Sequence, residues 1–135
     1  MKSLGSELKT SHWPKELNKY IDDFTLLPNF TASQLDIKNF ITNSDFDIGR
    51  KVGFKRLAIH FVVLPPNSRT SFPHAESEEE EFVFVIKGTP DLWLNGYIHK
   101  LDQFFAVGFP AGTGIAHSFI NNTNEDIYLL VAGDK

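Results

Sequence analysis

From residue 52 to the end, the sequence is a succession of short apolar runs, each followed by residues that favour turns. The runs are rich in β-branched and aromatic side chains, and Pro, Gly or Asn closes most of them, as is typical of strands. The clearest turn is Asn95-Gly96, which lies between alternating apolar residues and predicts a two-residue β-hairpin. No helical pattern interrupts the series. The sequence therefore predicts an all-β sandwich or small barrel in this part of the chain.

The first 50 residues are more mixed and carry one weak helix signal. It covers residues 14–22, where a proline stands early and apolar side chains follow at helical spacing. Residues 23–30 form an extended apolar piece that is broken at Pro28. We expect residues 1–50 to form an N-terminal arm that packs on the barrel or on a partner subunit, and residues 51–135 to form the barrel domain.

The composition excludes several classes of function. The chain has 135 residues and no cysteine, which rules out disulfides, thiolate nucleophiles and cysteine-based metal sites. Its formal net charge is −4 and it has no basic stripe, which argues against binding to nucleic acid. The longest apolar run, residues 57–66, is too short to cross a membrane, and the N-terminus lacks the apolar centre of a secretory signal. We expect a cytoplasmic protein that binds neither nucleic acid nor membranes.

A histidine and two glutamates near the start of one expected strand could form part of a binding site. His74 and Glu76 are two residues apart, so their side chains project from the same face of an extended segment. Glu81 opens the next strand, and the alternate residues Val83 and Val85 share its side. If that side is the barrel interior, Glu81 is a carboxylate at the rim of an apolar cavity. Such a group needs a cation, a hydrogen-bond donor or a proton.

A second group of polar residues opens a later strand. His117 begins this strand, with Phe119 and Asn121 on the same face. A single histidine in an apolar strand is more often a core residue than a ligand. Here, however, His117 could converge with the first group at one end of a barrel. Two imidazoles with one or two carboxylates suit iron, manganese, nickel or zinc.

Further residues are candidates for the lining of a ligand pocket. A loop arginine, Arg69, could pair with Glu76 or hold a substrate carboxylate, and it could equally be a surface residue. His60, in the middle of an expected strand, is either a structural residue or part of the pocket. The consecutive glutamates 78–80 are expected to be a solvated loop. The full set expected to line the pocket is Arg69, His60, Trp93, Phe119 and Asn121.

Together the two groups resemble the paired motifs of the cupin superfamily, and they are especially similar to small single-domain bacterial cupins of uncharacterised function. The first motif matches His74, Glu76, Glu81 and Gly88, with four residues between the two glutamates and six between Glu81 and Gly88. The second motif matches Pro110, Gly112, His117 and Asn121. The resemblance covers roughly residues 50 to 133. Two independent motifs in the right order make a chance match a poor explanation.

This resemblance implies a double-stranded β-helix, the jelly-roll barrel of the cupins, with a divalent metal ion at the barrel mouth. The ligands that it implies are His74, Glu76, Glu81 and His117. Cupins are frequently dimers, so the resemblance also implies a homodimer.

The sequence leaves open whether a metal ion occupies this site. Glu76 stands where most metal-binding cupins have a second histidine, which leaves two histidines and two glutamates as ligands. This set favours Mn(II), Fe(II), Ni(II) or Zn(II) over copper. The alternative is a site that has lost its metal and offers carboxylates to a polar ligand. Two carboxylates in one pocket repel each other and a cation removes that cost, which favours the metal.

Three functions therefore stay open: a metal-dependent enzyme acting on a small molecule, a small-molecule-binding cupin without catalysis such as a sensor or carrier, and a structural module with a vestigial pocket. The sequence does not decide whether the protein is an enzyme, and it identifies no catalytic residue or reaction, because the fold hosts many unrelated activities. The acidic first motif has no cluster of Lys or Arg beside it. This argues against highly anionic substrates such as sugar phosphates.

Overall fold

The computed structural model describes residues 2–4, 32–40 and 45–134. Strand β1 (Lys2–Leu4) pairs antiparallel with β2 (Ala32–Gln34), and a 3-10 helix, η4 (Ile37–Phe40), follows. The helix expected over residues 14–22 lies outside the described residues, and the packing of residues 1–50 on the barrel or on a partner stays a prediction. No helix in the described ranges is long and apolar enough to cross a membrane.

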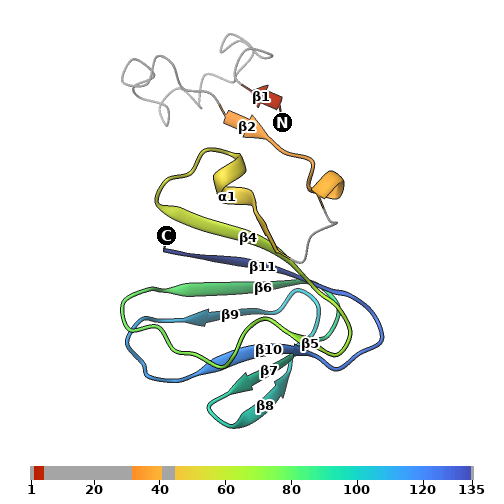
Figure 1. The fold of residues 1–135 in the computed structure, drawn as a ribbon, viewed down its shortest axis with the longest axis vertical. Helices are drawn as coiled ribbons and strands as arrows, with labels where there is room; N and C mark the ends of the chain where they lie inside the picture. Colours follow the sequence, from red (N-terminus) through yellow and green to blue (C-terminus); the bar gives the residue numbers. More distant parts are fainter. Residues whose placement is uncertain (1, 5–31, 41–44, 135) are drawn as a thin grey trace, which may run out of the picture. The chain divides into compact units, whose positions relative to one another are not determined.

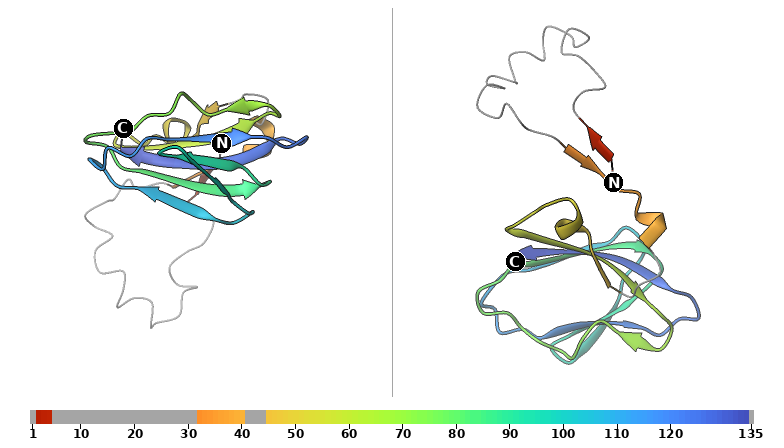
Figure 2. Two further views of the ribbon diagram at one scale, coloured as in Figure 1. Left: turned by 90° about the horizontal axis from the view of Figure 1, so that it is seen from below. Right: turned by 45° about the horizontal axis from the view of Figure 1, so that its top comes forward.

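Residues 45–134 fold almost entirely into antiparallel strands. The strands are β3 (Asp45–Asp47), β4 (Leu57–Leu64), β5 (Ser68–Arg69), β6 (Glu81–Lys87), β7 (Asp91–Leu94), β8 (Tyr97–Lys100), β9 (Ala106–Phe109), β10 (His117–Asn121) and β11 (Ile127–Asp134). A five-stranded sheet has the order β3-β4-β11-β6-β9, and a four-stranded sheet has the order β5-β10-β7-β8. The two sheets face each other (Figures 1 and 2). This arrangement confirms the predicted all-β jelly roll.

Strands β7 and β8 form the predicted hairpin, with Leu94 paired to Tyr97. The two residues between them, Asn95 and Gly96, have φ values of 47° and 94°. A two-residue turn of this type needs positive φ at both positions, and Asn and Gly tolerate it best. The local sequence therefore determines the register of this hairpin.

The five-stranded sheet begins at Asp45, shortly before the expected domain boundary at residue 51. Strand β3 pairs with the edge of β4 and places Asp47 opposite His60. A single helical turn, α1 (Ile48–Lys51), then leads toward β4. The Asp47 carboxylate caps this turn by accepting a hydrogen bond from the Arg50 N–H at 2.9 Å.

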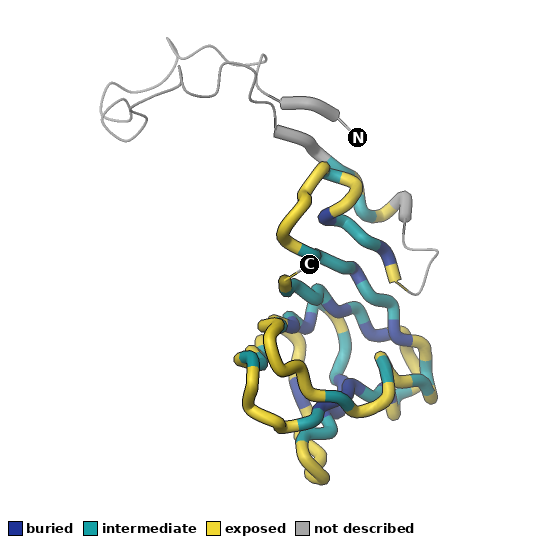
Figure 3. The backbone as a smooth tube through the Cα atoms, turned by 60° about the vertical axis from the view of Figure 1, so that its left-hand side comes forward, coloured by how far each residue is buried: buried dark blue, intermediate teal, exposed yellow. Residues whose placement is uncertain are grey.

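The core lies between the inner faces of the two sheets. Alternate residues of β6 and β11 point inward, and Val83, Val85, Ile127 and Leu129 are almost completely buried. Figure 3 shows the buried stretches along the strands and the exposed stretches in the loops between them. Val83 and Val85 lie on the interior side of the strand that Glu81 opens, which is the condition under which Glu81 was expected at the rim of an apolar cavity. The core cluster consists of Leu64, Val83, Val85, Leu92, Leu101, Phe119, Ile127 and Leu129.

The outer face of the larger sheet also carries large apolar side chains. Phe82, which alternates with the buried Val83, is 45% exposed, and Phe104 is 68% exposed. The Phe104 ring stacks on Phe84 with 6.2 Å between ring centroids. Exposed apolar surface of this kind is typical of interaction sites. The homodimer implied by the resemblance stays a prediction.

Gly133 in β11 provides a stability test of the contact between β11 and the chain leading into β6. A Cβ atom at Gly133 would lie 2.5 Å from the backbone carbonyl oxygen of Glu80. We predict that Gly133→Ala lowers the free energy of unfolding by about 1–3 kcal/mol, because a backbone atom has to move. Urea denaturation measures this change.

Gly108 in β9 is the matched control for this substitution. A Cβ atom at Gly108 would meet nothing within 4 Å. Gly108→Ala should leave the free energy of unfolding within about 0.5 kcal/mol of the wild-type value. Equal effects of the two substitutions would contradict the close contact at Gly133.

Candidate metal centre

Backbone pairing brings the two histidines of the expected site together. His74 forms an isolated antiparallel bridge with His117, the first residue of β10. The His74 N–H donates to the His117 carbonyl at 3.2 Å, and the His117 N–H donates to the His74 carbonyl at 3.0 Å. Residues paired in this way place their side chains on the same side of the ladder. The two ring centroids are 5.0 Å apart.

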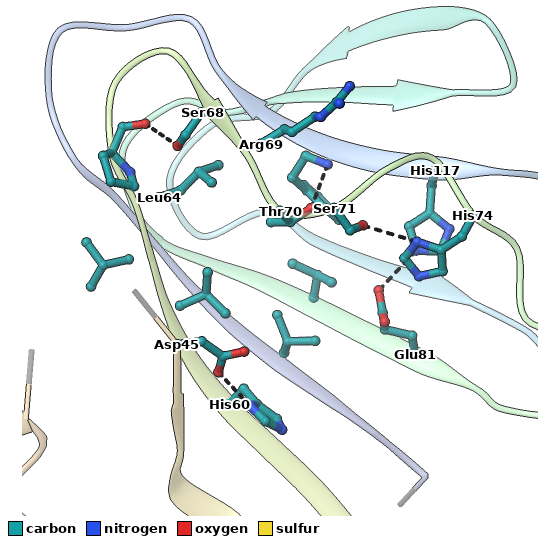
Figure 4. A pocket seen from close by; sticks show the side chains of 16 residues that line it. Asp45, His60, Leu64, Ser68, Arg69, Thr70, Ser71, His74, Glu81 and His117 are labelled. Carbon is teal, nitrogen blue, oxygen red and sulfur yellow. Dashed lines mark hydrogen bonds and ion pairs between the residues drawn. The ribbon is translucent and has the colours of Figure 1, made fainter. Parts of the chain in front are cut away.

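Glu81 reaches the histidines from the opposite sheet. It is the first residue of β6 and lies on the interior face of that strand. One carboxylate oxygen, Oε1, is 3.0 Å from Nε2 of His117 (Figure 4). His74, Glu81 and His117 each offer a ligand atom, and these atoms lie within 4.8 Å of one another. The structure therefore brings three of the four expected ligands together.

Glu76, the fourth expected ligand, lies at the edge of this group. Its Oε1 is 3.7 Å from Nε2 of His74, and its side chain is 43% exposed. Its backbone carbonyl accepts a hydrogen bond from the Gly112 N–H at 2.9 Å, which connects the loops of the two motifs. In the described part of the chain, the group of mutually close ligand atoms does not include Glu76. Its role as a ligand stays a prediction.

Stacking against an aromatic ring holds His117 in place. Its side chain is buried, and its ring lies parallel to Phe109 with 3.6 Å between centroids. Phe109 is the register partner of Glu81 in the pairing of β9 with β6. The strand pair that presents the carboxylate therefore also presents the ring that orients the imidazole. The Nδ1 atom of His117 is buried and has no hydrogen-bond partner among the described residues.

Neighbouring backbone determines the tautomer of His74. Its Nδ1 lies 3.0 Å from the carbonyl oxygen of Phe72 and 3.1 Å from the hydroxyl of Ser71. A carbonyl oxygen only accepts, so Nδ1 carries the hydrogen and Nε2 keeps its lone pair. Metal-binding histidines in proteins usually have this arrangement, with the second nitrogen donating to a carbonyl or carboxylate.

The three converging side chains line a cavity of about 400 Å³. The larger sheet contributes an apolar wall to it through Val62, Val83 and Val131, and the segment at β5 contributes hydroxyl groups from Thr70 and Ser71. Figure 4 shows these side chains around the cavity, with Glu81, His74 and His117 on one side. A cavity of this size with a few convergent polar groups suits a small molecule.

The structure separates the five expected pocket residues into two groups. His60, Arg69 and Phe119 line the cavity. Trp93 does not line it, because strand alternation in β7 turns its buried neighbour Leu92 toward the core and Trp93 away from it. The guanidinium of Arg69 lies over the Phe72 ring at 4.4 Å.

Asn121, which was also expected in the pocket, is the last residue of β10, and its side chain bonds instead to the turn between β10 and β11. Its Nδ2 donates to the carbonyl oxygens of Leu64 at 2.8 Å and Glu125 at 2.7 Å. Its Oδ1 accepts from the Thr123 N–H at 2.8 Å. The side chain is completely buried and its hydrogen bonds all go to this turn and to the end of β4. The expectation for Asn121 is thus corrected to a structural role.

Asp45 lines the cavity and was not anticipated. It lies in the part of the chain that was expected to be an arm, where no strong strand pattern marks it. Its Oδ1 is 2.6 Å from Nδ1 of His60. Only the pairing of β3 with β4 brings it there.

Comparison with known proteins identifies the family. A family model described as a cupin domain matches residues 60–133, more than half of the chain. The chain belongs to the cupin family. The comparison with curated proteins gives no match.

Solved structures of other cupin-like proteins share its fold. A sugar phosphate isomerase of the cupin superfamily from Silicibacter pomeroyi is 26% identical, with a TM-score of 0.66, 77% of this chain covered and 68% of the other. A protein assigned provisionally as a sugar phosphate isomerase, from Acidithiobacillus ferrooxidans, is 23% identical, with a TM-score of 0.69 and coverage of 76% and 74%. The polyketide cyclase RemF from Streptomyces resistomycificus is 24% identical, with a TM-score of 0.58 and coverage of 67% and 63%.

The corrected role of Asn121 gives a second prediction. Asn121→Ala leaves the carbonyls of Leu64 and Glu125 without their buried donor, so we predict a loss of about 1–3 kcal/mol in the free energy of unfolding. Because the side chain is outside the cavity, Mn(II) binding by the folded variant should match the wild type in isothermal titration calorimetry. Weaker Mn(II) binding with unchanged stability would instead support the pocket role that the sequence suggested.

Proposed function

We propose that this cupin is a divalent-metal-dependent enzyme that acts on a small molecule. The observation that carries the proposal is the convergence of His74, Glu81 and His117 within 4.8 Å at one side of a cavity. Nitrogen and oxygen ligands without sulfur suit Mn, Fe, Ni or Zn. Three protein ligands leave coordination positions for water or substrate, which is typical of catalytic rather than structural metal sites.

The residues present fit such an ion in ligand type and in preorganisation. The backbone bridge and the Phe109 ring hold the two imidazoles in place, and the Phe72 carbonyl keeps Nε2 of His74 free of hydrogen. Glu81 supplies one negative charge toward a divalent cation. When bound, the ion would act as a Lewis acid toward an oxygen atom of the ligand.

The lining of the cavity supports a substrate with limited negative charge. Arg69 is the permanently charged cation in this lining, and it could hold one carboxylate or phosphate group. The likeness to a sugar phosphate isomerase supports isomerisation as the class of reaction. A single arginine suits a singly anionic or neutral substrate better than a highly charged one.

The alternative is a cupin that binds a small molecule without a metal. One contact favours it: His117 Nε2 and Glu81 Oε1 lie 3.0 Å apart and satisfy each other directly. An ion on Nε2 would require the hydrogen to reside on Nδ1, which is buried and has no partner among the described residues. The pair could therefore serve as a closed polar contact in a ligand cavity.

Elemental analysis of the untagged protein, purified without chelator, separates these two functions. We predict about one Mn, Fe, Ni or Zn ion per chain in the wild type, and a loss of most of it in Glu81→Gln, because the carboxylate charge is removed from the group. His117→Gln should lose the ion as well.

Glu78→Gln is the matched control, since Glu78 belongs to the same acidic run, is exposed and does not line the cavity. It should retain the wild-type metal content. Background metal in the wild type as well as in the variants, together with a melting temperature that added Mn(II) or Zn(II) does not change, would refute the metal-dependent function and favour the binding protein.

A further inference from the structure

The cavity contains a second polar pair, which is distinct from the candidate metal ligands. Asp45 and His60 both line it, and His60 is not in the group formed by His74, Glu81 and His117. We propose that Asp45 and His60 form a proton-transfer pair, in which His60 is the catalytic base and Asp45 positions it. This inference rests on the proposed function, because it assigns a reaction step to the same cavity.

The register of β3 and β4 creates the pair. Asp45 is opposite Val62, and Asp47 is opposite His60, so Asp45 is a diagonal neighbour of the histidine. A diagonal neighbour on the same face of a sheet is within reach of a long side chain. Asp47 caps α1 through the Arg50 N–H, whereas the Asp45 carboxylate lies 2.6 Å from Nδ1 of His60.

This contact selects the tautomer that a base requires. An ionised carboxylate only accepts hydrogen bonds, so Nδ1 of His60 donates to Asp45 and Nε2 keeps its lone pair in the neutral ring. Figure 4 shows the second ring nitrogen of His60 turned away from Asp45. A histidine oriented by a carboxylate on one nitrogen and basic on the other is the arrangement that proton-abstracting enzymes use.

The pair lines the same cavity as the candidate metal centre, on the same face of the larger sheet as Glu81. His60 is opposite Val131, which is in turn opposite Val83, two residues along β6 from Glu81. Two strand spacings, about 10 Å, separate β4 from β6, and the offset of two residues adds about 7 Å along the strand, so the backbone positions of His60 and Glu81 are about 12 Å apart. A ligand with an oxygen atom at the metal centre could therefore present a neighbouring C–H group to His60.

Stability does not account for the short contact. The side chains of His60 and Asp45 are 33% and 61% exposed, and exposed ion pairs contribute little to the folded state. The pair would therefore have no strong structural reason to be held at this distance. The position of the pair in the cavity lining provides a functional reason for the short distance.

The chemistry points to small hydroxy-carbonyl compounds as the substrate class. His60 Nε2 takes a proton from the carbon next to the carbonyl, the C–H electron pair forms a C=C bond, and the carbonyl π electrons move to oxygen. Return of the proton to the former carbonyl carbon, with transfer of the hydroxyl proton from the oxygen on the deprotonated carbon to the former carbonyl oxygen, leaves the C=O on the deprotonated carbon and completes an isomerisation without any oxidant or reductant. Thr70 in the lining suits a hydroxylated ligand, since its Oγ1 accepts from the Phe119 N–H and its own O–H can still donate.

Proton exchange in D2O tests this step directly. The Mn(II)-loaded full-length protein is incubated with dihydroxyacetone, erythrulose or dihydroxyacetone phosphate, and loss of the α-carbon proton signal is followed by 1H NMR. We expect exchange above the protein-free rate with at least one probe, and a decrease on the order of 10²- to 10⁴-fold in His60→Gln, because a general base contributes about that factor. Asp45→Asn should lose at least about tenfold, because the wrong tautomer then forms.

Asp47→Asn is the matched control: the same change in the same strand, at a carboxylate that caps α1. It should exchange at the wild-type rate. Independently of activity, 15N NMR should show the Nδ1–H tautomer of His60 in the wild type and a shift toward Nε2–H in Asp45→Asn. An unchanged tautomer in Asp45→Asn would overturn the positioning role even if His60→Gln failed to fold.

The outcomes distinguish this inference from the proposed function. A wild-type protein that binds none of Mn(II), Fe(II), Ni(II) and Zn(II) would remove the proposed function itself. A wild-type protein that binds Mn(II) but exchanges none of the three probes, or a His60→Gln variant that exchanges at the wild-type rate, would refute the proton-transfer pair and leave the metal centre in place.

Discussion

The pair of backbone hydrogen bonds between His74 and His117 is the constraint on which the candidate site depends. These bonds join the loop before β6 to the start of β10 and set two imidazoles side by side. Side-chain packing alone would hold a loop histidine less firmly, because its backbone would be free to move. With the bridge in place, Glu81 from the opposite sheet completes the group. The site is thus built where the inner faces of the two sheets meet.

The larger sheet has two roles in this arrangement. Its interior face supplies the apolar wall of the cavity, the Glu81 carboxylate and, two strands away, the His60 imidazole. Strand alternation makes this combination possible, because positions two apart share a face and can mix core and site residues. A small molecule bound between them would contact both polar groups. Apolar neighbours such as Val83 and Val131 would limit the access of water to it.

Local patterns and motif spacing account for β4, for β6 to β11 with the Asn95-Gly96 hairpin, and for the convergence of His74, Glu81 and His117, so these features were predictable. Trp93 and Asn121 were misplaced because the face of a strand and the partners of a turn residue depend on register and long-range hydrogen bonds. Asp45 could not be found for a related reason. Its short strand has weak local preference, and its pairing with β4 brings it to His60 only in the folded chain.

The most direct test of metal binding by His74, Glu81 and His117 is an anomalous difference map from crystals grown with MnCl2, with data recorded above and below the manganese absorption edge. We predict one strong peak inside the cavity, bounded by Nε2 of His74, the Glu81 carboxylate and the His117 ring. A map without a peak there, with Glu81 still hydrogen-bonded to His117, would contradict it. A peak found solely among the exposed glutamates 76, 79 and 80 would contradict it as well.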